Sequence, residues 1–331
     1  HVIFLDENDF NCAKKHCKNH DIALPKTSVI NVPATIAIPS NSSAMREGGH
    51  ILSFGMIRNG KGVAHLIKLA QLIKNSDHHL VKNKKIMVVG SICLAQKDHS
   101  DSALYKLMTA LYPSKHSELE KKTPLELKAL FKQYNDIDRL LPELPIGLHL
   151  DVAQENLPAL FDKCTYSYLP AYRGATLRNS SISSSLSNQF ITFAHEGRIT
   201  PASLKADGAY SDALVLIAHR DRTNVYSYAA DTVFEEIQRR EENPDLNAET
   251  ITALETLVGE QLSHPVIAAK HALVYSGLTR PSLALGGENR FYTSAAASSV
   301  NAPIPKGQDK TPPHKKYKNV DNYPLIKYNN V

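Results

Sequence analysis

Short apolar runs alternate with longer amphipathic segments between residues 50 and 220, and this alternation restricts the fold more than any other feature of the chain. The amphipathic segments carry apolar residues at helical spacing. Strands that alternate with helices form parallel sheets covered by helices. We therefore predict an α/β fold, a Rossmann-like parallel sheet with helices on both faces. The expected strands are 51–55, 85–90, 146–150, 166–169, 190–193 and 214–217.

The first strand, helix and strand form the clearest unit. After Gly55 a polar loop leads to Val63, and apolar residues then recur at the spacing of one helical face as far as Ile73. A β-branched run at 85–90 follows. A right-handed crossover between two parallel strands is the expected structure of this unit.

Helices are expected to close the domain, and a tail follows them. Segments 223–240 and 248–277 have helical periodicity, and Asn243-Pro244 separates them. Beyond Pro281 apolar periodicity stops, and Gly, Ser, Ala, Lys, Pro and Asn dominate. Such a segment buries too little apolar surface to offset its ordering entropy, so 279–331 is predicted to be a linker and a flexible basic tail.

Charge and cysteine content exclude several classes of protein. The chain has 38 Lys and Arg against 33 Asp and Glu, and residues 301–331 alone hold six Lys and two Asp. The body is therefore almost neutral, which argues against nucleic acid as a partner. No apolar stretch reaches the roughly 20 residues of a transmembrane segment. Four Cys without a signal peptide favour the reducing cytoplasm, although a start at His1 indicates that the true N-terminus is missing.

Two loops combine glycines with cationic side chains. Gly55 to Gly62 joins a strand to a helix and includes Arg58 and Lys61, so helix amides and two cations would face an anion there. The alternative is an ordinary loop with solvated basic residues, since the loop matches neither the Walker nor the dinucleotide pattern.

The second loop, 169–181, again runs from a strand to a helix and carries Arg173, Gly174 and Arg178. Its two arginines could equally be surface charges. Ligands of open parallel sheets bind at the carboxyl ends of the strands, so one anionic ligand could bridge both loops.

These segments, in this order and about 110 residues apart, resemble the C-terminal, donor-binding half of a retaining GT-B glycosyltransferase. The strand glycine at Gly55 and the Lys61-Gly62 pair match that family's pattern. The likeness covers about residues 1–278. It implies that 1–45 is a remnant or linker from a preceding acceptor domain and that 46–278 is the donor-binding domain.

The resemblance implies transfer of a sugar, with retention, from a nucleotide-diphosphate sugar to an unknown acceptor. The nucleotide sugar would be a co-substrate, and neither a cofactor nor a metal would be needed. Catalytic residues stay unassigned. The expected donor-binding residues are Gly55, Arg58, Lys61, Arg173, Gly174, Thr176, Arg178 and Ser181.

Some residues depart from the family pattern. The usual Arg after the strand glycine is Met56, and Arg173 and Ser181 stand where the family often has two acidic residues. The alternative is therefore a non-catalytic GT-B-like binding or scaffold partner of an active glycosyltransferase, which would supply the separate acceptor domain. A weaker alternative is a Rossmann-like nucleotide binder without sugar chemistry.

The group Cys12, His16, Cys17 and His20 matches no familiar zinc spacing.

Overall fold

The structure is a computed structural model, and it describes residues 2–5, 7–30, 49–58, 61–92, 102–120, 122–135, 141–171, 174–218 and 225–279. Contacts divide the chain into two units, His1–Pro281 and Ser282–Val331. All the described residues lie in the first unit, so the expected tail at 279–331 falls almost entirely outside them.

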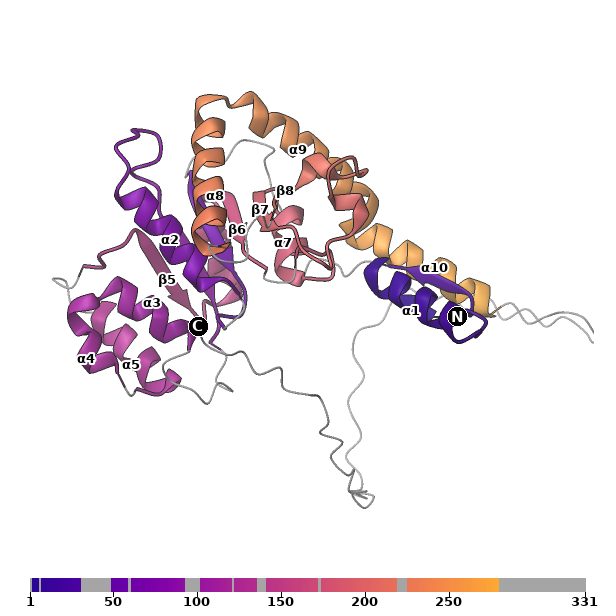
Figure 1. The fold of residues 1–331 in the computed structure, drawn as a ribbon, viewed down its shortest axis with the longest axis horizontal. Coiled ribbons are helices and arrows are strands. Elements are labelled where there is room, and N and C mark those ends of the chain that lie inside the picture. The colour runs from indigo at the N-terminus through magenta and orange to yellow at the C-terminus, as the bar shows by residue number, and fades with distance from the viewer. Residues whose placement is uncertain are drawn as a thin grey trace, which may run out of the picture. The chain divides into compact units, whose positions relative to one another are not determined.

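Six parallel strands form the central sheet, as the sequence predicts (Figure 1). Their order is β5-β4-β3-β6-β7-β8, which is the 3-2-1-4-5-6 order of a Rossmann-like sheet. Each predicted strand lies within about two residues of an observed one. The strands are β3 (His50–Phe54), β4 (Ile86–Gly90), β5 (Ile146–Leu150), β6 (Cys164–Leu169), β7 (Ile191–His195) and β8 (Val215–Ile217).

Helices cover both faces of the sheet because alternate strand residues point to opposite sides. Ile51 packs into one apolar cluster, whereas Leu52 and Phe54 pack into the other. The first cluster is completed by α2 (Val63–Lys74), α3 (Ala103–Leu111), α5 (Pro124–Asn135) and α8 (Val225–Glu242). The second is completed by α6 (Leu157–Phe161), α7 (Ser180–Ser187) and α9 (Asp245–Leu257).

Side-chain caps fix where several helices begin. The Ser102 hydroxyl accepts a hydrogen bond from the Tyr105 amide at 3.0 Å and caps α3. Thr123 and Glu126 form a reciprocal capping box at α5, with bonds of 2.7 and 3.2 Å. The segment between these helices also forms the short α4 (His116–Leu119).

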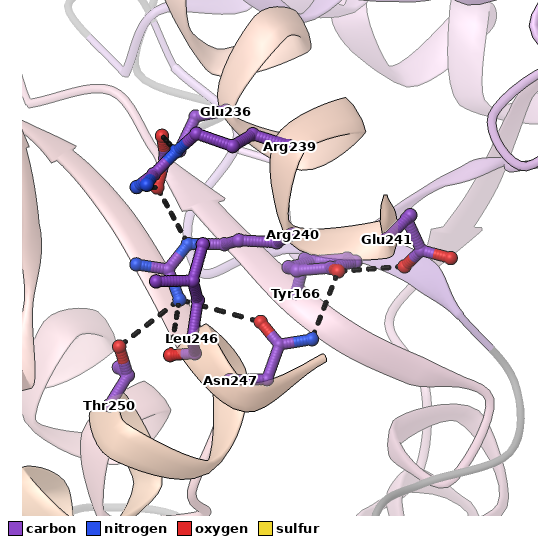
Figure 2. A network of polar contacts seen from close by, with 8 residues as sticks. All are labelled: Tyr166, Glu236, Arg239, Arg240, Glu241, Leu246, Asn247 and Thr250. Carbon is purple, nitrogen blue, oxygen red and sulfur yellow. Dashed lines mark hydrogen bonds and ion pairs between the residues drawn. The ribbon is translucent and has the colours of Figure 1, made fainter. Parts of the chain in front are cut away.

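A buried arginine joins α8 to α9 across the expected break at Asn243-Pro244 (Figure 2). Arg240 donates to Glu236 at 2.8 Å, to the Leu246 carbonyl at 3.0 Å and to Thr250 at 3.1 Å. Because it is only 6% exposed, these acceptors compensate for the loss of water around its charge.

The predicted single helix over 248–277 is wrong. A π-helical turn at Val258–Leu262 follows α9, and Ser263 is extended before α10 (His264–Thr279) begins. Pro265 explains the break, since proline lacks an amide hydrogen and fits only the first turn of a helix.

Residues 2–30 form a small parallel unit of β1 (Val2–Phe4), α1 (Glu7–Asn19) and β2 (Thr27–Val29). The polar helix α1 and the short strand β2 were not predicted from the sequence. Ile3 and Ile30 pack with Ile267 and Val274 of α10. Among the described residues, none of the helices has the length and apolar character needed to cross a membrane.

Candidate functional site

The strand order reverses between β3 and β6. The chain runs from β3 through β4 to β5 on one side of this point, and β6, β7 and β8 continue on the other. Crossovers that leave in opposite directions open a crevice at the carboxyl ends of the two strands, where open α/β sheets bind ligands. Both predicted anion loops begin at this point, the first after β3 and the second after β6.

A pocket of about 40 Å³ lies in this crevice. A water molecule needs roughly 10–15 Å³ by this measure, so the space suits a few waters or one group the size of a phosphate. Both loops contribute to its walls. The residues that line it are Ser53, Phe54, Gly55, Met56, Ile57, Lys61, Val63, Leu66, Val88, Leu169, Pro170, Ala171, Asn179 and Ser181.

Two glycines let the loops meet. Gly55 has φ of 120°, and a Cβ there would lie 2.5 Å from the Ser181 hydroxyl oxygen. Gly62 caps α2 with φ of 68°, and a Cβ on it would overlap the ring of Pro170. Only glycine combines this backbone conformation with so close an approach.

Lys61 supplies positive charge to the pocket. Burial lowers the pKa of its ammonium group, and the nearby Arg58 guanidinium lowers it further. The first turn of α2 contains no acidic residue. Among the described residues that line the pocket there is no Asp or Glu, so the local field favours an anion.

The N-terminus of α7 forms the opposite wall of the pocket. The Asn179 side chain accepts a hydrogen bond from the Ser181 amide at 3.1 Å, and both residues line the space. Their hydroxyl and amide groups could contact a bound oxyanion.

Of the predicted site residues, Gly55, Lys61 and Ser181 line the pocket, and Arg58 is exposed beside Lys61. Arg173 lies outside the described residues.

Three other predicted residues do not line the pocket. Gly174 packs against Gly197 and Thr200 beyond β7, and Thr176 is buried with 5% exposure. Arg178 forms an ion pair of 2.6 Å with Asp9 of α1.

Sequence reasoning did not select Ser53, Pro170 or Asn179 as site residues. Asn179 had a detectable signal, since an Asn directly before a helix is a typical N-cap. Pro170 had none, because its role depends on how closely it approaches Gly62 in space.

Buried histidines pack behind the site. His65 of α2 meets His195 of β7 edge to face, with ring centroids 4.5 Å apart. The Nε2 atom of His195 is 2.9 Å from the Tyr168 hydroxyl oxygen, and burial raises the pKa of that hydroxyl. Both histidines are at most 2% exposed and lie in packed interior, and neither lines the pocket.

Cys12, His16 and Cys17 lie on α1 and His20 directly follows it, with the rings of His16 and His20 4.4 Å apart. Within the part of the chain that the structure describes, no three His, Cys, Asp or Glu side chains are arranged to hold a metal ion.

Comparisons with known proteins were made by sequence and by structure. No protein-family model matches the chain, and no curated protein sequence matches it. Solved structures do match. The pneumococcal O-GlcNAc transferase GtfA, in complex with UDP and GlcNAc, aligns with a TM-score of 0.53 and 11% identity over 84% of this chain and 45% of that one.

TarM aligns with a TM-score of 0.47 and 12% identity, over 83% of this chain and 43% of that one. The C-terminal domain of the glycosyl transferase group 1 family protein LpcC from Francisella tularensis gives 0.40 and 12%, over 69% and 97%. The chain thus spans about half the length of GtfA and TarM.

Identities this low speak to the fold alone. The strand order, the helices on both faces and the alignment with GtfA agree with one another. The chain has the fold of the Rossmann-like domain of GT-B glycosyltransferases.

Proposed function

We propose that this chain is the donor-binding part of a glycosyltransferase, which transfers a sugar from a nucleotide-diphosphate sugar to an acceptor with retention of configuration. The proposal rests on one observation. Two loops that are distant in sequence enclose a phosphate-sized pocket at the strand-order reversal, and Lys61 lines it.

The diphosphate is the part of the donor that this pocket suits. Lys61 and the first amides of α2 would hold one phosphoryl group, with Ser181 on the opposite side. The second phosphate, the nucleoside and the sugar would extend out of so small a space. Arg58 is exposed next to Lys61 and could reach the outer phosphate, and Arg178 could do so once it leaves Asp9.

Lys61, the first amides of α2 and Ser181 would act by electrostatic stabilisation of the leaving group. When the bond between the sugar and the diphosphate breaks, negative charge grows on the leaving phosphate oxygens. Donors and a cation already fixed around those oxygens stabilise that charge without reorganising, and this is a large contribution to catalysis. The proposed chemistry needs no metal.

A cytoplasmic location is part of the proposal, and the free thiols of Cys12, Cys17 and Cys164 support it.

A second candidate is a non-catalytic GT-B-like partner of an active transferase. It is favoured by two departures from the GT-B pattern, since Arg173 and Ser181 stand where that family often has two acidic residues, the second of which holds the ribose of the nucleotide. Such a partner would bind nucleotide weakly or not at all, and a separate protein would supply the acceptor domain.

Titration calorimetry of the full chain with UDP, GDP and ADP tests nucleotide binding. Lys61→Ala should weaken binding by about 1.5–3 kcal/mol, the range for hydrogen bonds to charged groups. Lys74→Ala is the matched control, because Lys74 is exposed and lies in the last turn of α2, at the opposite end of the helix from Lys61. Absence of heat at millimolar nucleotide, or equal effects of the two variants, would contradict the proposal.

Turnover separates the two candidates. The chain is incubated with UDP-glucose or GDP-mannose, alone and with sugar acceptors, and release of the nucleoside diphosphate is followed. Release by wild type but not by Lys61→Ala excludes the non-catalytic candidate. Binding without release, persisting with every acceptor tried, supports it.

A further inference from the structure

Strand β8 ends the sheet on one side and pairs with β7 along one edge only. The pairing is parallel and joins Phe193 to Val215, Ala194 to Leu216 and His195 to Ile217. The other edge of β8 has no neighbouring strand among the described residues. An open edge presents backbone donors and acceptors to any extended chain that reaches it.

The ladder fixes which backbone groups face outward. The Glu196 amide donates to the Ile217 carbonyl at 2.9 Å, so the backbone of Ile217 points at β7. Direction alternates along a strand, and the amide and carbonyl of Leu216 therefore point away from β7, as do those of the extended Leu214. Outside the ladder, no backbone hydrogen bond of Leu214 or Leu216 is found among the described residues.

A groove of about 1170 Å³ runs along this free edge. Four consecutive residues, Leu214 to Ile217, line it, which places the strand edge in its wall. Parts of α8 and α9 line it as well. Its volume exceeds the range of about 300–1,000 Å³ for small-molecule sites, and its strand wall suits an extended chain better than a compact ligand.

The described part of the groove is acidic. Its carboxylates are Glu196, Asp207, Asp212, Glu236 and Glu249, against two guanidinium groups, those of Arg239 and Arg240. Both arginines are already bound to Glu236, at 2.7 and 2.8 Å, as Figure 2 shows. Glu196 is paired with Lys205 at 3.2 Å. The groove still keeps an excess of negative charge, which comes from Asp207, Asp212 and Glu249.

We propose that this groove is a docking site for an extended, positively charged segment of a partner protein, which adds a strand beside β8. The backbone of Leu214 and Leu216 would supply the hydrogen bonds, and Asp212 and Glu249 would attract the basic side chains. A second copy of this chain fits less well through its own groove, because that face carries the same negative charge. This inference is independent of the proposed sugar chemistry.

Amide hydrogen exchange in the free full-length chain tests the open edge. The Leu216 amide should exchange much faster than the Val215 and Ile217 amides, which belong to the ladder with β7. Equal protection of all three amides would overturn the proposal, since it would mean that the edge is already covered.

Peptide binding tests the occupant. The probe is a fluorescein-labelled ten-residue peptide of alternating Lys and Val, and the comparison peptide alternates Glu and Val. Anisotropy should show saturable binding of the Lys peptide, at least about tenfold tighter than the Glu peptide. Binding should also slow exchange of the Leu216 amide. Equal affinities, or no saturable binding of the Lys peptide, would overturn the proposal.

Variants tie the binding to the groove. Leu216→Pro removes the outward amide hydrogen and leaves the ladder with β7 intact, because proline is accepted on the free side of an edge strand. This variant should weaken binding of the Lys peptide at least about tenfold. Its fold is checked by circular dichroism.

Charge reversal gives an independent test. The double variant Asp212→Lys with Glu249→Lys should weaken binding of the Lys peptide by a similar factor. The control is Glu120→Lys with Glu155→Lys, which changes the net charge equally at two exposed residues outside the groove. Equal effects of the two double variants would overturn the proposal.

Discussion

Replacing Gly62 by Ala should destabilise the domain and weaken the site together. Gly62 has φ of 68°, and a left-handed conformation costs an alanine about 1–2 kcal/mol. The added Cβ also overlaps the Pro170 ring, and overpacking of this kind costs about 1–3 kcal/mol. The free energy of unfolding should therefore fall by about 2–5 kcal/mol.

Urea denaturation followed by far-ultraviolet circular dichroism measures this change, since the chain contains no Trp for fluorescence. Pro170→Gly, alone and combined with Gly62→Ala, completes a double-mutant cycle. Pro170→Gly should relieve most of the overlap, and some should remain because the carbonyl oxygen of residue 170 would still lie 2.9 Å from the new Cβ. It should relieve none of the backbone strain, because that strain comes from the φ of residue 62.

Two results would refute this reasoning. A loss below about 0.5 kcal/mol for Gly62→Ala would mean that neither strain nor overlap is present. A cycle without coupling between residues 62 and 170 would mean that the two loops do not touch. UDP affinity should fall in parallel, since the substitution pushes apart the walls that the proposed phosphate site needs.

Two further predictions concern Lys61 and the core. Because burial and Arg58 lower the Lys61 pKa, its ammonium group loses its charge at a lower pH than the usual 10.5. As the pH is raised, UDP affinity measured by calorimetry should therefore begin to fall before pH 10.5 is reached. The Lys61→Arg variant should keep its UDP affinity over the same range. Tyr166→Phe removes a hydroxyl that donates to Glu241 at 2.7 Å, and in urea denaturation it should cost about 1–3 kcal/mol. The control Tyr105→Phe should cost under about 1 kcal/mol, because the hydroxyl of Tyr105 forms only an exposed hydrogen bond with His116.

The strands were the most predictable part of the fold. A strand buried on both faces must be apolar along most of its length, and 85–90 could be located for that reason, since Ile86 to Val89 are all apolar and buried. The segment 7–29 was less predictable. Its helix, α1, is polar and carries no run of apolar residues that would reveal a buried face in the sequence.

The site was predictable only where the path of the backbone was. Gly55 and Lys61 flank a short loop between a strand and a helix, so their place at the sheet edge follows from the pattern. Gly174 has φ of 109° and lies against Gly197, which carries the following residues toward β7 and away from the pocket. No sequence pattern fixes such a turn, and the directions of Thr176 and Arg178 depend on it.

The reversal of strand order has a consequence for how the domain responds to a ligand. The pocket exists only when the segment ending at β5 and the segment starting at β6 have both assembled, because each contributes one wall. A ligand held there binds neither half alone. At a free concentration one hundred times its dissociation constant, the ligand would raise the free energy of unfolding by about 2.7 kcal/mol. Because it contacts both halves, the melting temperature of the whole sheet would rise in a single cooperative transition.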